Sequence, residues 1–383
     1  MNTTTAGISE ATVLSTFLAL VGIDSPSGQE QAVAAYLEGE LQGLGCQTWR
    51  DSKGNLLARR PGSGAGGGET SQRAGQGPLA GAPPLLLSAH MDTVQPGVGI
   101  KPRVEGGIVR SDGTTILGAD DKAGITAILE ALRSVHGGDT PVRPLEIALT
   151  VEEETGLSGS KALDLSTLQS RQAVVLDSNG AVGIIVNQAP ASDHIEATVT
   201  GRAAHAGVAP EEGINALVAA ARALAGMRLG RIDPQTTANF GVIRGGTASN
   251  VVPERVELVG EARSRSESAL EAQTRHMVTS LEEAAAAVGA RAEVRVSRAY
   301  GKIDVPPDSP LIQRVSAAIR ACGLEPKLQP TGGGSDANVL NAAGITAVNL
   351  GTGYTGPHSL DEQVAVVDLV RITELVRALI TAP

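Results

Sequence analysis

The first candidates for chemistry are His90 and Asp92, which stand two residues apart in the stretch Leu85 to Val94, after three leucines. On an extended backbone, residues i and i+2 point the same way, so this carboxylate stands beside the imidazole. A carboxylate that holds one ring nitrogen leaves the other nitrogen free and more basic, which is how metal-binding histidines are arranged. A surface histidine near an aspartate has the same spacing, so the pair alone does not decide.

Further acids and a late histidine extend this pattern. An aspartate pair precedes a helical segment, a run of three glutamates ends an apolar stretch, and a single aspartate follows the segment AVVL. Each motif alone has a simpler explanation, since an aspartate pair often caps a helix and a glutamate run is often a solvated turn. Together, two imidazoles and three carboxylates suit two metal ions, zinc or cobalt, bridged by one carboxylate. The candidate ligands are His90, Asp120, Glu153 or Glu154, Asp177 and His358.

A sheet must position these side chains. The apolar run from Leu85 suits a buried, parallel strand. We expect a helix from Lys122 to Val135, followed by strands at Pro144 to Val151 and Ala173 to Leu176. Such alternation is typical of an α/β domain with a central mixed sheet flanked by helices. Each strand delivers an acid at its carboxyl end, where open α/β sheets place their sites.

The pattern changes at Gln188. The order strand, helix, strand, strand, helix, strand across 188–296 predicts an inserted ferredoxin-like α+β lid, which would also be a dimerisation domain. From residue 297 the α/β pattern resumes, so the α/β domain is discontinuous and comprises 1–187 and 297–383. Within it, the Gly/Ala/Pro-rich tract 61–84 has almost nothing to bury and is expected to be a disordered loop.

Composition excludes several classes of partner. The chain has 383 residues and a net charge of −10, so neither nucleic acid nor an anionic membrane is an expected partner. Two cysteines are too few for a disulfide framework or a thiolate metal site. The N-terminus lacks a basic segment, and no apolar run reaches about 18 residues, so neither a signal peptide nor a membrane span is predicted. We expect a cytoplasmic protein.

The ordered motifs resemble a known family. SAHMDTV, LGADDKAG, EEETG, VVLDSNG and a late histidine occur as in the di-zinc exopeptidases and deacylases, a family that includes peptidase T, carboxypeptidase G and acetylornithine deacetylase. The motifs span nearly the whole chain, and a match of this many in order is specific. LGADDKAG and TGGGSDANVLNAAG are most similar to the peptidase T-like branch.

The resemblance implies a role for each ligand. Asp120 is similar to the carboxylate that bridges two zinc ions, and its spacing to Lys122 and Gly124 favours it over Asp121. The family resemblance also implies a cis peptide bond after the bridging aspartate. The remaining implied ligands are His90 and Asp177 on one zinc ion and Glu154 and His358 on the other.

Two more acids match residues with their own roles in the family. Asp92 matches the acid that orients the first histidine, and Glu153 matches the general base, adjacent to a ligand but projecting differently. The chemistry needs a base because the attacking water must lose a proton and the leaving nitrogen must gain one. Glu152 is given no role and is expected to be a solvated strand end.

Other residues resemble substrate contacts. His205 in GRAAHAG is similar to the imidazole that stabilises the tetrahedral oxyanion. A histidine that only forms a turn before Gly207 would have the same sequence pattern. Asn250 and Arg263 resemble groups that hold a substrate's polar end or carboxylate, and a structural salt bridge would equally explain Arg263. The glycines in TGGGSDAN would let the backbone approach the substrate, or they simply form a turn. The aspartate of the same motif could hold an ammonium group of the substrate. These last candidates are Gly333, Gly334 and Asp336.

Together, these features predict a metal-dependent exopeptidase of short peptides, of the tripeptidase type, that releases the N-terminal residue. The alternatives are a carboxypeptidase or N-acyl-amino-acid deacylase of the same family, and a non-catalytic metal-dependent peptide-binding protein. Glu153 argues against the last, because a metal-holding scaffold needs no base beside its ligand. We expect two Zn²⁺ as cofactors, with Co²⁺ or Mn²⁺ as substitutes, short peptides as substrates, and a homodimer.

Overall fold

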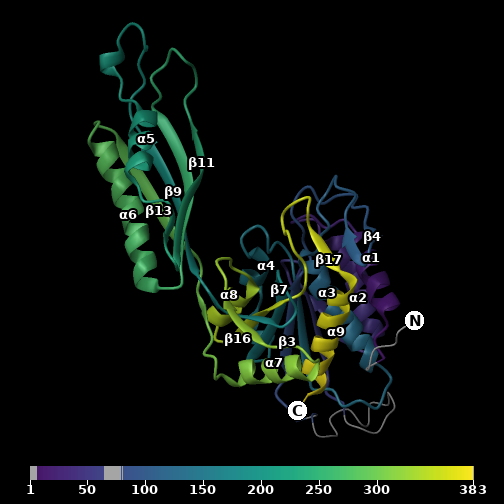
Figure 1. The fold of residues 1–383 in the computed structure, drawn as a ribbon. Coiled ribbons are helices and arrows are strands. Elements are labelled where there is room, and N and C mark those ends of the chain that lie inside the picture. The colour runs from purple at the N-terminus through teal and green to yellow at the C-terminus, as the bar shows by residue number, and fades with distance from the viewer. Residues whose placement is uncertain (1–6, 64–78, 80, 383) are drawn as a thin grey trace. The chain divides into compact units, whose positions relative to one another are not determined.

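The computed structural model describes residues 7–63, 79 and 81–382, which divide into two compact units (Figure 1). The first unit comprises 1–187, 304–330 and 335–383, and the second comprises 188–303 and 331–334. The second unit therefore continues beyond residue 296, because its last strand runs on to Tyr300, and it includes most of the glycine loop. The expected disordered loop, 61–84, lies mostly outside the described residues.

The first unit is built on a nine-stranded sheet with the strand order β1-β2-β6-β3-β7-β16-β8-β14, and β15 pairs with β8. Its centre is parallel, because β3 pairs in parallel with β6 and β7, and β7 pairs in parallel with β16. β2 runs antiparallel to β6 and β8 runs antiparallel to β16, so the sheet is mixed, and the predicted fold class is confirmed. All residues of β3 are buried, as its apolar run predicts. The strands are β1 (Gln47–Arg50), β2 (Leu56–Arg60), β3 (Leu85–His90), β6 (Leu145–Thr150), β7 (Gln172–Ser178), β8 (Ile184–Ala189), β14 (Ile303–Asp304), β15 (Lys327–Pro330) and β16 (Thr346–Gly351).

Helices complete the core of this unit. α3 is buried on nearly every side, which its mostly apolar sequence allows, and it packs with α1 and α9 in one cluster. α7 begins at Pro310 after Ser309, whose side chain accepts the N–H of Ile312 and so caps the helix. No described helix is long and apolar enough to cross a membrane. The helices are α1 (Glu10–Val21), α2 (Gln31–Gly43), α3 (Ala119–Val135), α4 (Ser158–Ala162), α7 (Pro310–Ala321), α8 (Asp336–Ala342) and α9 (Val366–Thr381).

A small antiparallel sheet ties the end of the chain to an early hairpin. The hairpin consists of β4 (Arg103–Glu105) and β5 (Ile108–Arg110), and β17 (Gln363–Ala365) pairs with β5. β5 thus pairs with a segment some 250 residues later in the chain, which no local sequence pattern predicts. This pairing fixes the chain that follows His358 beside the hairpin that leads toward α3.

The second unit is a five-stranded antiparallel sheet with the order β10-β11-β12-β9-β13. Along β9, Ile195, Ala197 and Val199 are buried and pack in one core with α5 and α6, whereas Glu196 and Thr200 are exposed. The order β11-β12-β9-β13 with two helices is that of the ferredoxin-like arrangement we expected. The edge strand β10 was not expected. The elements are β9 (Ala191–Thr200), α5 (Ala216–Gly226), β10 (Gly230–Asp233), β11 (Thr236–Gly245), β12 (Arg255–Ser264), α6 (Glu267–Ala286) and β13 (Arg291–Tyr300).

Candidate metal centre

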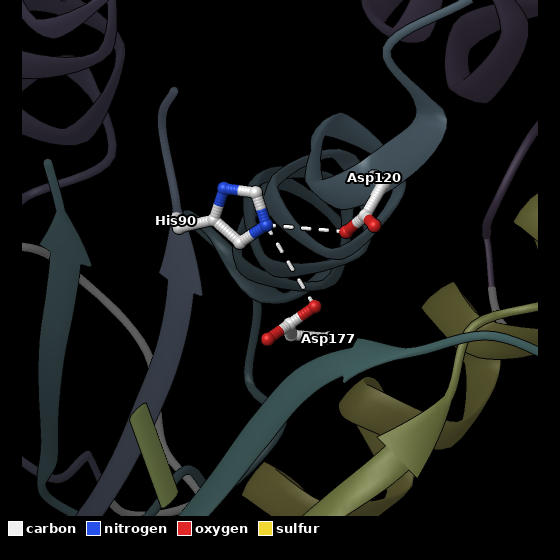
Figure 2. A group of neighbouring side chains, drawn as sticks. All are labelled: His90, Asp120 and Asp177. Carbon is white, nitrogen blue, oxygen red and sulfur yellow. Dashed lines mark hydrogen bonds and ion pairs between the residues drawn. The ribbon is translucent and has the colours of Figure 1, made fainter. Parts of the chain in front are cut away.

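His90, Asp120 and Asp177 come together where β3 and β7 end and α3 begins (Figure 2). The Nε2 atom of His90 lies 3.1 Å from Oδ1 of Asp120 and 3.7 Å from Oδ1 of Asp177. The imidazole is buried and both carboxylate side chains are about nine-tenths buried. One atom from each residue lies within 4.8 Å of the other two, so the three side chains could hold one metal ion.

Asp120 also belongs to a second group, with Glu154 and His358. The Nε2 atom of His358 lies 2.8 Å from Oε1 of Glu154 and 3.5 Å from Oδ2 of Asp120. The two oxygens of Asp120 therefore face different histidines, which is the arrangement that a bridging carboxylate needs. The peptide bond between Asp120 and Asp121 is cis, as the resemblance implied.

The residues after Asp120 have structural partners. The carboxylate of Asp121 accepts the main-chain N–H groups of His90 and Gly124, at 3.3 and 3.2 Å. Lys122 is fully buried, and its Nζ donates to the main-chain oxygen of Ile23 at 2.8 Å. Asp121 therefore faces the backbone, and Asp120 is the member of the pair that faces both histidines.

Electrostatics at the centre favour a cation. Hydrogen bonds to Asp120 and Glu154 raise the pKa of His358 to about 10. Burial opposes the charged form of His90, but the combined effect of Asp120, Asp92 and Asp177 outweighs it and holds the pKa of this imidazole well above the usual value. Burial, together with the negative charge of Asp120, also raises the pKa of Asp177, against the opposing effect of His90. A metal ion would replace the protons that these groups hold.

Asp92 connects the first histidine to the two adjacent glutamates. His90 Nδ1 lies 2.9 Å from the main-chain oxygen of Asp92 and 3.4 Å from its Oδ1, so Nε2 is left for a metal. The Asp92 carboxylate also accepts the N–H groups of Glu153 and Glu154, at 2.9 and 3.2 Å, and the hydroxyl of Ser27 at 2.6 Å. Burial raises its pKa, but these bonds and His90 lower it overall.

Glu153 lies in a third possible ligand group, with His90 and Glu154. Burial raises its pKa well above the usual value, and the nearby charges of Asp336 and Glu154 add to this, while His90 opposes it. Asp336 is itself buried; its Oδ2 accepts the Thr150 hydroxyl at 2.5 Å, and its Oδ1 has no hydrogen-bond partner. A carboxyl with a raised pKa can both take and return a proton.

Two further residues hold the ligands and were missed in the sequence. The hydroxyl of Tyr354, which is buried, donates to Oδ1 of Asp120 at 3.0 Å and lies 3.5 Å from Oδ1 of Asp177. The side chain of Asn349 accepts the N–H of Asp177 at 2.9 Å and donates to its main-chain oxygen at 2.6 Å. Asn349 could have been found in the sequence, because it is a polar residue within the apolar strand TAVNLG. No sequence pattern marks Tyr354.

Comparison with known proteins decides the family. Residues 86–382 match the model described as Peptidase family M20/M25/M40. The chain belongs to this peptidase family. It is 38% identical to aminopeptidase PepT from Bacillus cereus ATCC 10987, with a TM-score of 0.85 and 98% of each chain covered. A tripeptidase from Staphylococcus aureus is 35% identical, with a TM-score of 0.88 and 98% of each chain covered. Peptidase T of Escherichia fergusonii is 30% identical over 283 residues, which are 70% of this chain and 68% of that relative.

These relatives confirm the predicted resemblance to the peptidase T-like branch. This M20 peptidase carries two of its predicted substrate residues on adjoining exposed segments of the second unit. His205 pairs with Val251, and the main-chain oxygen of Asn250 accepts the N–H of Ala206 at 2.9 Å. His205 Nδ1 accepts the N–H of Gly207 at 3.2 Å, which is the turn contact expected under the simpler interpretation. The substrate roles of both residues stay predictions.

The other predicted substrate residues of the second unit have structural contacts. Arg263 forms a two-point ion pair with Glu261, in which Nε lies 2.9 Å from Oε1 and Nη2 donates to Oε2 at 2.9 Å. A Cβ atom at Gly334 would lie 2.4 Å from the ring of Tyr300, so a larger residue would require that ring to move, whereas Gly333 has room for a Cβ atom. The salt bridge given as the alternative for Arg263 is therefore present, and the crowding at Gly334 is a reason for glycine that the sequence did not suggest.

Proposed function

We propose that this peptidase is a zinc-dependent aminopeptidase that releases the N-terminal residue of short peptides, tripeptides above all. The observation that carries the proposal is the sharing of Asp120 between two groups of potential metal ligands. One group adds His90 and Asp177, and the other adds Glu154 and His358. The relatives named as an aminopeptidase and a tripeptidase support this direction of cleavage and this peptide length.

The donor set fits zinc or cobalt. Each of the two groups that share Asp120 supplies one imidazole nitrogen and two carboxylate oxygens, which are ligands that these metals accept. We propose two Zn²⁺ as the cofactors, with Co²⁺ or Mn²⁺ as substitutes. When bound, the metals would supply Lewis-acid chemistry, stabilising negative charge at the scissile carbonyl and lowering the pKa of water.

The chain's own residues place and move the proton. Glu153 is proposed to take a proton from the attacking water and to return it to the leaving nitrogen. Its place beside His90 and Glu154 supports both steps. Asp92 holds the main chain at Glu153 and Glu154, so the base and the neighbouring ligand keep a fixed relation.

Recognition of a free N-terminus requires a negative group for the ammonium. Asp336 is the proposed contact, and its buried Oδ1 without a hydrogen-bond partner supports this choice. His205 is proposed to stabilise the oxyanion, and Asn250 and Arg263 to hold the far carboxylate of the peptide. Gly333 and Gly334 would border the substrate backbone.

Removal of the metals tests the cofactor. Dialysis against a chelator should abolish peptide hydrolysis, and Zn²⁺ or Co²⁺ should restore it. His90→Ala, Asp177→Ala and His358→Ala should each lose bound metal by elemental analysis. Full activity in a sample shown to be metal-free would refute the metal-dependent mechanism.

A matched peptide set tests the end that is recognised. Free tripeptides, their N-acetyl forms and their C-terminal amides are compared by mass spectrometry of the products. We expect cleavage of the first bond in free tripeptides, no cleavage after acetylation and weaker cleavage after amidation. Preferred hydrolysis of the acetylated forms would instead support the deacylase or carboxypeptidase alternative.

We also propose that the enzyme is a cytoplasmic homodimer. Sedimentation measures the assembly. Mixing the inactive variants His205→Ala and Glu153→Gln then tests whether His205 acts in its own subunit or in the partner. Activity returns in mixed dimers only if this histidine acts across the dimer.

A further inference from the structure

Glu362 makes an unusual set of contacts close to the metal centre. Its carboxylate is buried, with the residue 1% exposed, and it accepts three main-chain N–H groups from the segment that leads into the start of α3. Oε2 accepts from Leu117 and Gly118, both at 2.8 Å, and Oε1 accepts from Asp120 at 2.9 Å. Three short hydrogen bonds to one buried carboxylate hold the segment from Leu117 to Asp120 firmly.

The segment that carries Glu362 is itself closed at its base. Thr355 and Gln363 exchange two main-chain hydrogen bonds, at 2.9 and 3.0 Å, and His358 lies between them. Gln363 also begins β17, which pairs with β5. Glu362 therefore stands at the fixed end of a short loop whose other functional residue is His358.

The loop between Thr355 and Gln363 thus contacts Asp120 twice. Its main-chain N–H donates to Glu362, and its Oδ2 lies 3.5 Å from His358 Nε2. We propose that Glu362 is a positioning residue that fixes Asp120 and His358 relative to each other, and with them the spacing of the two metal positions. This inference rests on the proposed metal-dependent function, because it assigns Asp120 the bridging role.

An ordinary capping role is the rival explanation. A carboxylate at the start of a helix is favourable in any protein, and three paired N–H groups stabilise the fold whatever Asp120 does. The two roles differ in what they predict for metal binding. A cap affects only stability, whereas a positioning residue changes the affinity for metal and the rate of reaction of the folded enzyme.

Glu362→Gln is the main test, because it keeps the size of the side chain and one acceptor oxygen, and Glu362→Ala removes all three bonds. Asp361→Asn is the matched control, since it removes the same charge from the adjacent, exposed residue. Leu41→Ala is the stability control. Truncating this buried side chain of α2 should lower the unfolding temperature without changing the loop that carries His358 and Glu362.

Three readouts are taken on the folded proteins: Zn²⁺ affinity by competition with a chelator, the visible absorption spectrum of the Co²⁺ form, and kcat and KM on a free tripeptide. We expect Glu362→Gln to weaken metal binding or to lower kcat by about 10- to 100-fold, with little change in KM, and to alter the Co²⁺ spectrum. Glu362→Ala should be worse, and both controls should match the wild type in all three readouts.

Wild-type metal affinity, spectrum and kcat in Glu362→Gln, with only a lower unfolding temperature, would overturn the inference and leave a cap. If Glu362→Ala does not fold, Glu362→Gln still decides. The metal readouts also separate this inference from the proposed function. A wild type that binds metal but leaves tripeptides uncut refutes the peptidase specificity, while weaker metal binding in Glu362→Gln would still support the positioning role.

Discussion

Replacing Glu153 and Glu154 by glutamine, one at a time, should separate a base from a ligand. Both main-chain N–H groups donate to Asp92, so the backbone anchor remains in either variant. Glu154 Oε1 contacts His358 Nε2 at 2.8 Å within a group that includes Asp120. We therefore expect Glu153→Gln to keep its full metal content and Glu154→Gln to lose metal.

The expected loss of rate follows from the role of Glu153. Removing a general base costs about 10²- to 10⁴-fold, which corresponds to about 2.7–5.4 kcal/mol of activation free energy. The decrease should fall on kcat, with KM little changed, because the base acts in the transition state and makes no contact on which peptide binding depends.

The same substitution should stabilise the metal-free protein. Burial raises the pKa of Glu153, and Asp336 and Glu154 add to this, so the charged form is unfavourable in the fold. For a carboxyl whose folded-state pKa is raised, stability falls as pH rises from the unfolded pKa through the folded one. Glutamine is neutral, so Glu153→Gln in chelator should melt at a higher temperature than the wild type at about pH 8, with the difference shrinking toward about pH 4.

Elemental analysis after gel filtration, kinetics on a free tripeptide and calorimetry measure these quantities. Glu152→Gln is the matched control, because the Glu152 carboxylate pairs with Lys53 at 2.7 Å instead of facing the centre, and it should keep metal and kcat. Equal loss of metal in Glu153→Gln and Glu154→Gln would refute the assignment. It would mean that both acids are ligands, as the group of His90, Glu153 and Glu154 permits.

Three further predictions concern the centre and the glycine loop. Metal binding should release protons and strengthen as pH rises toward about 10, because the pKa of His358 is raised to about 10, first of all by Asp120. Calorimetry in buffers of different ionisation enthalpy measures the number of protons released. A metal affinity that does not depend on pH would contradict this prediction. Tyr354→Phe removes the hydroxyl that donates to Asp120 and should weaken metal binding or lower kcat about tenfold or more, as measured by chelator competition and kinetics. Gly334→Ala should lower the free energy of unfolding by about 1–3 kcal/mol because of its clash with an adjacent tyrosine ring, whereas Gly333→Ala should unfold like the wild type in urea.

The candidate ligands could be picked out in the sequence because each signal is local. His90 is the last residue of β3 and Asp177 is the next-to-last residue of β7, and parallel strands bring their carboxyl ends to one edge of the sheet. Asp120 could be separated from Asp121 only through the family motif, because the two carboxylates differ in direction and not in sequence context.

The residues that hold the ligands could not be predicted in the same way. Tyr354 lies 234 residues from Asp120 in the chain, and Glu362 lies 242 residues from it, so neither contact leaves a local pattern. β14 has two residues and β10 has four, which is too short for alternation to be read. The second unit extends past its predicted end for a related reason, since β13 continues through the exposed residues Ser297 and Arg298 to Tyr300.

The order of the chain around the inserted unit has a consequence for biosynthesis. Four of the predicted ligands, together with Glu153, precede the second unit, whereas His358 and Glu362 follow it. A ribosome makes the chain from its N-terminus, so the acids and His90 emerge first. A nascent chain that has reached only the insertion lacks one imidazole and the loop that closes on Asp120. With the proposed ligand set, peptide cleavage should therefore require the nearly finished polypeptide, and truncated translation products should lack it.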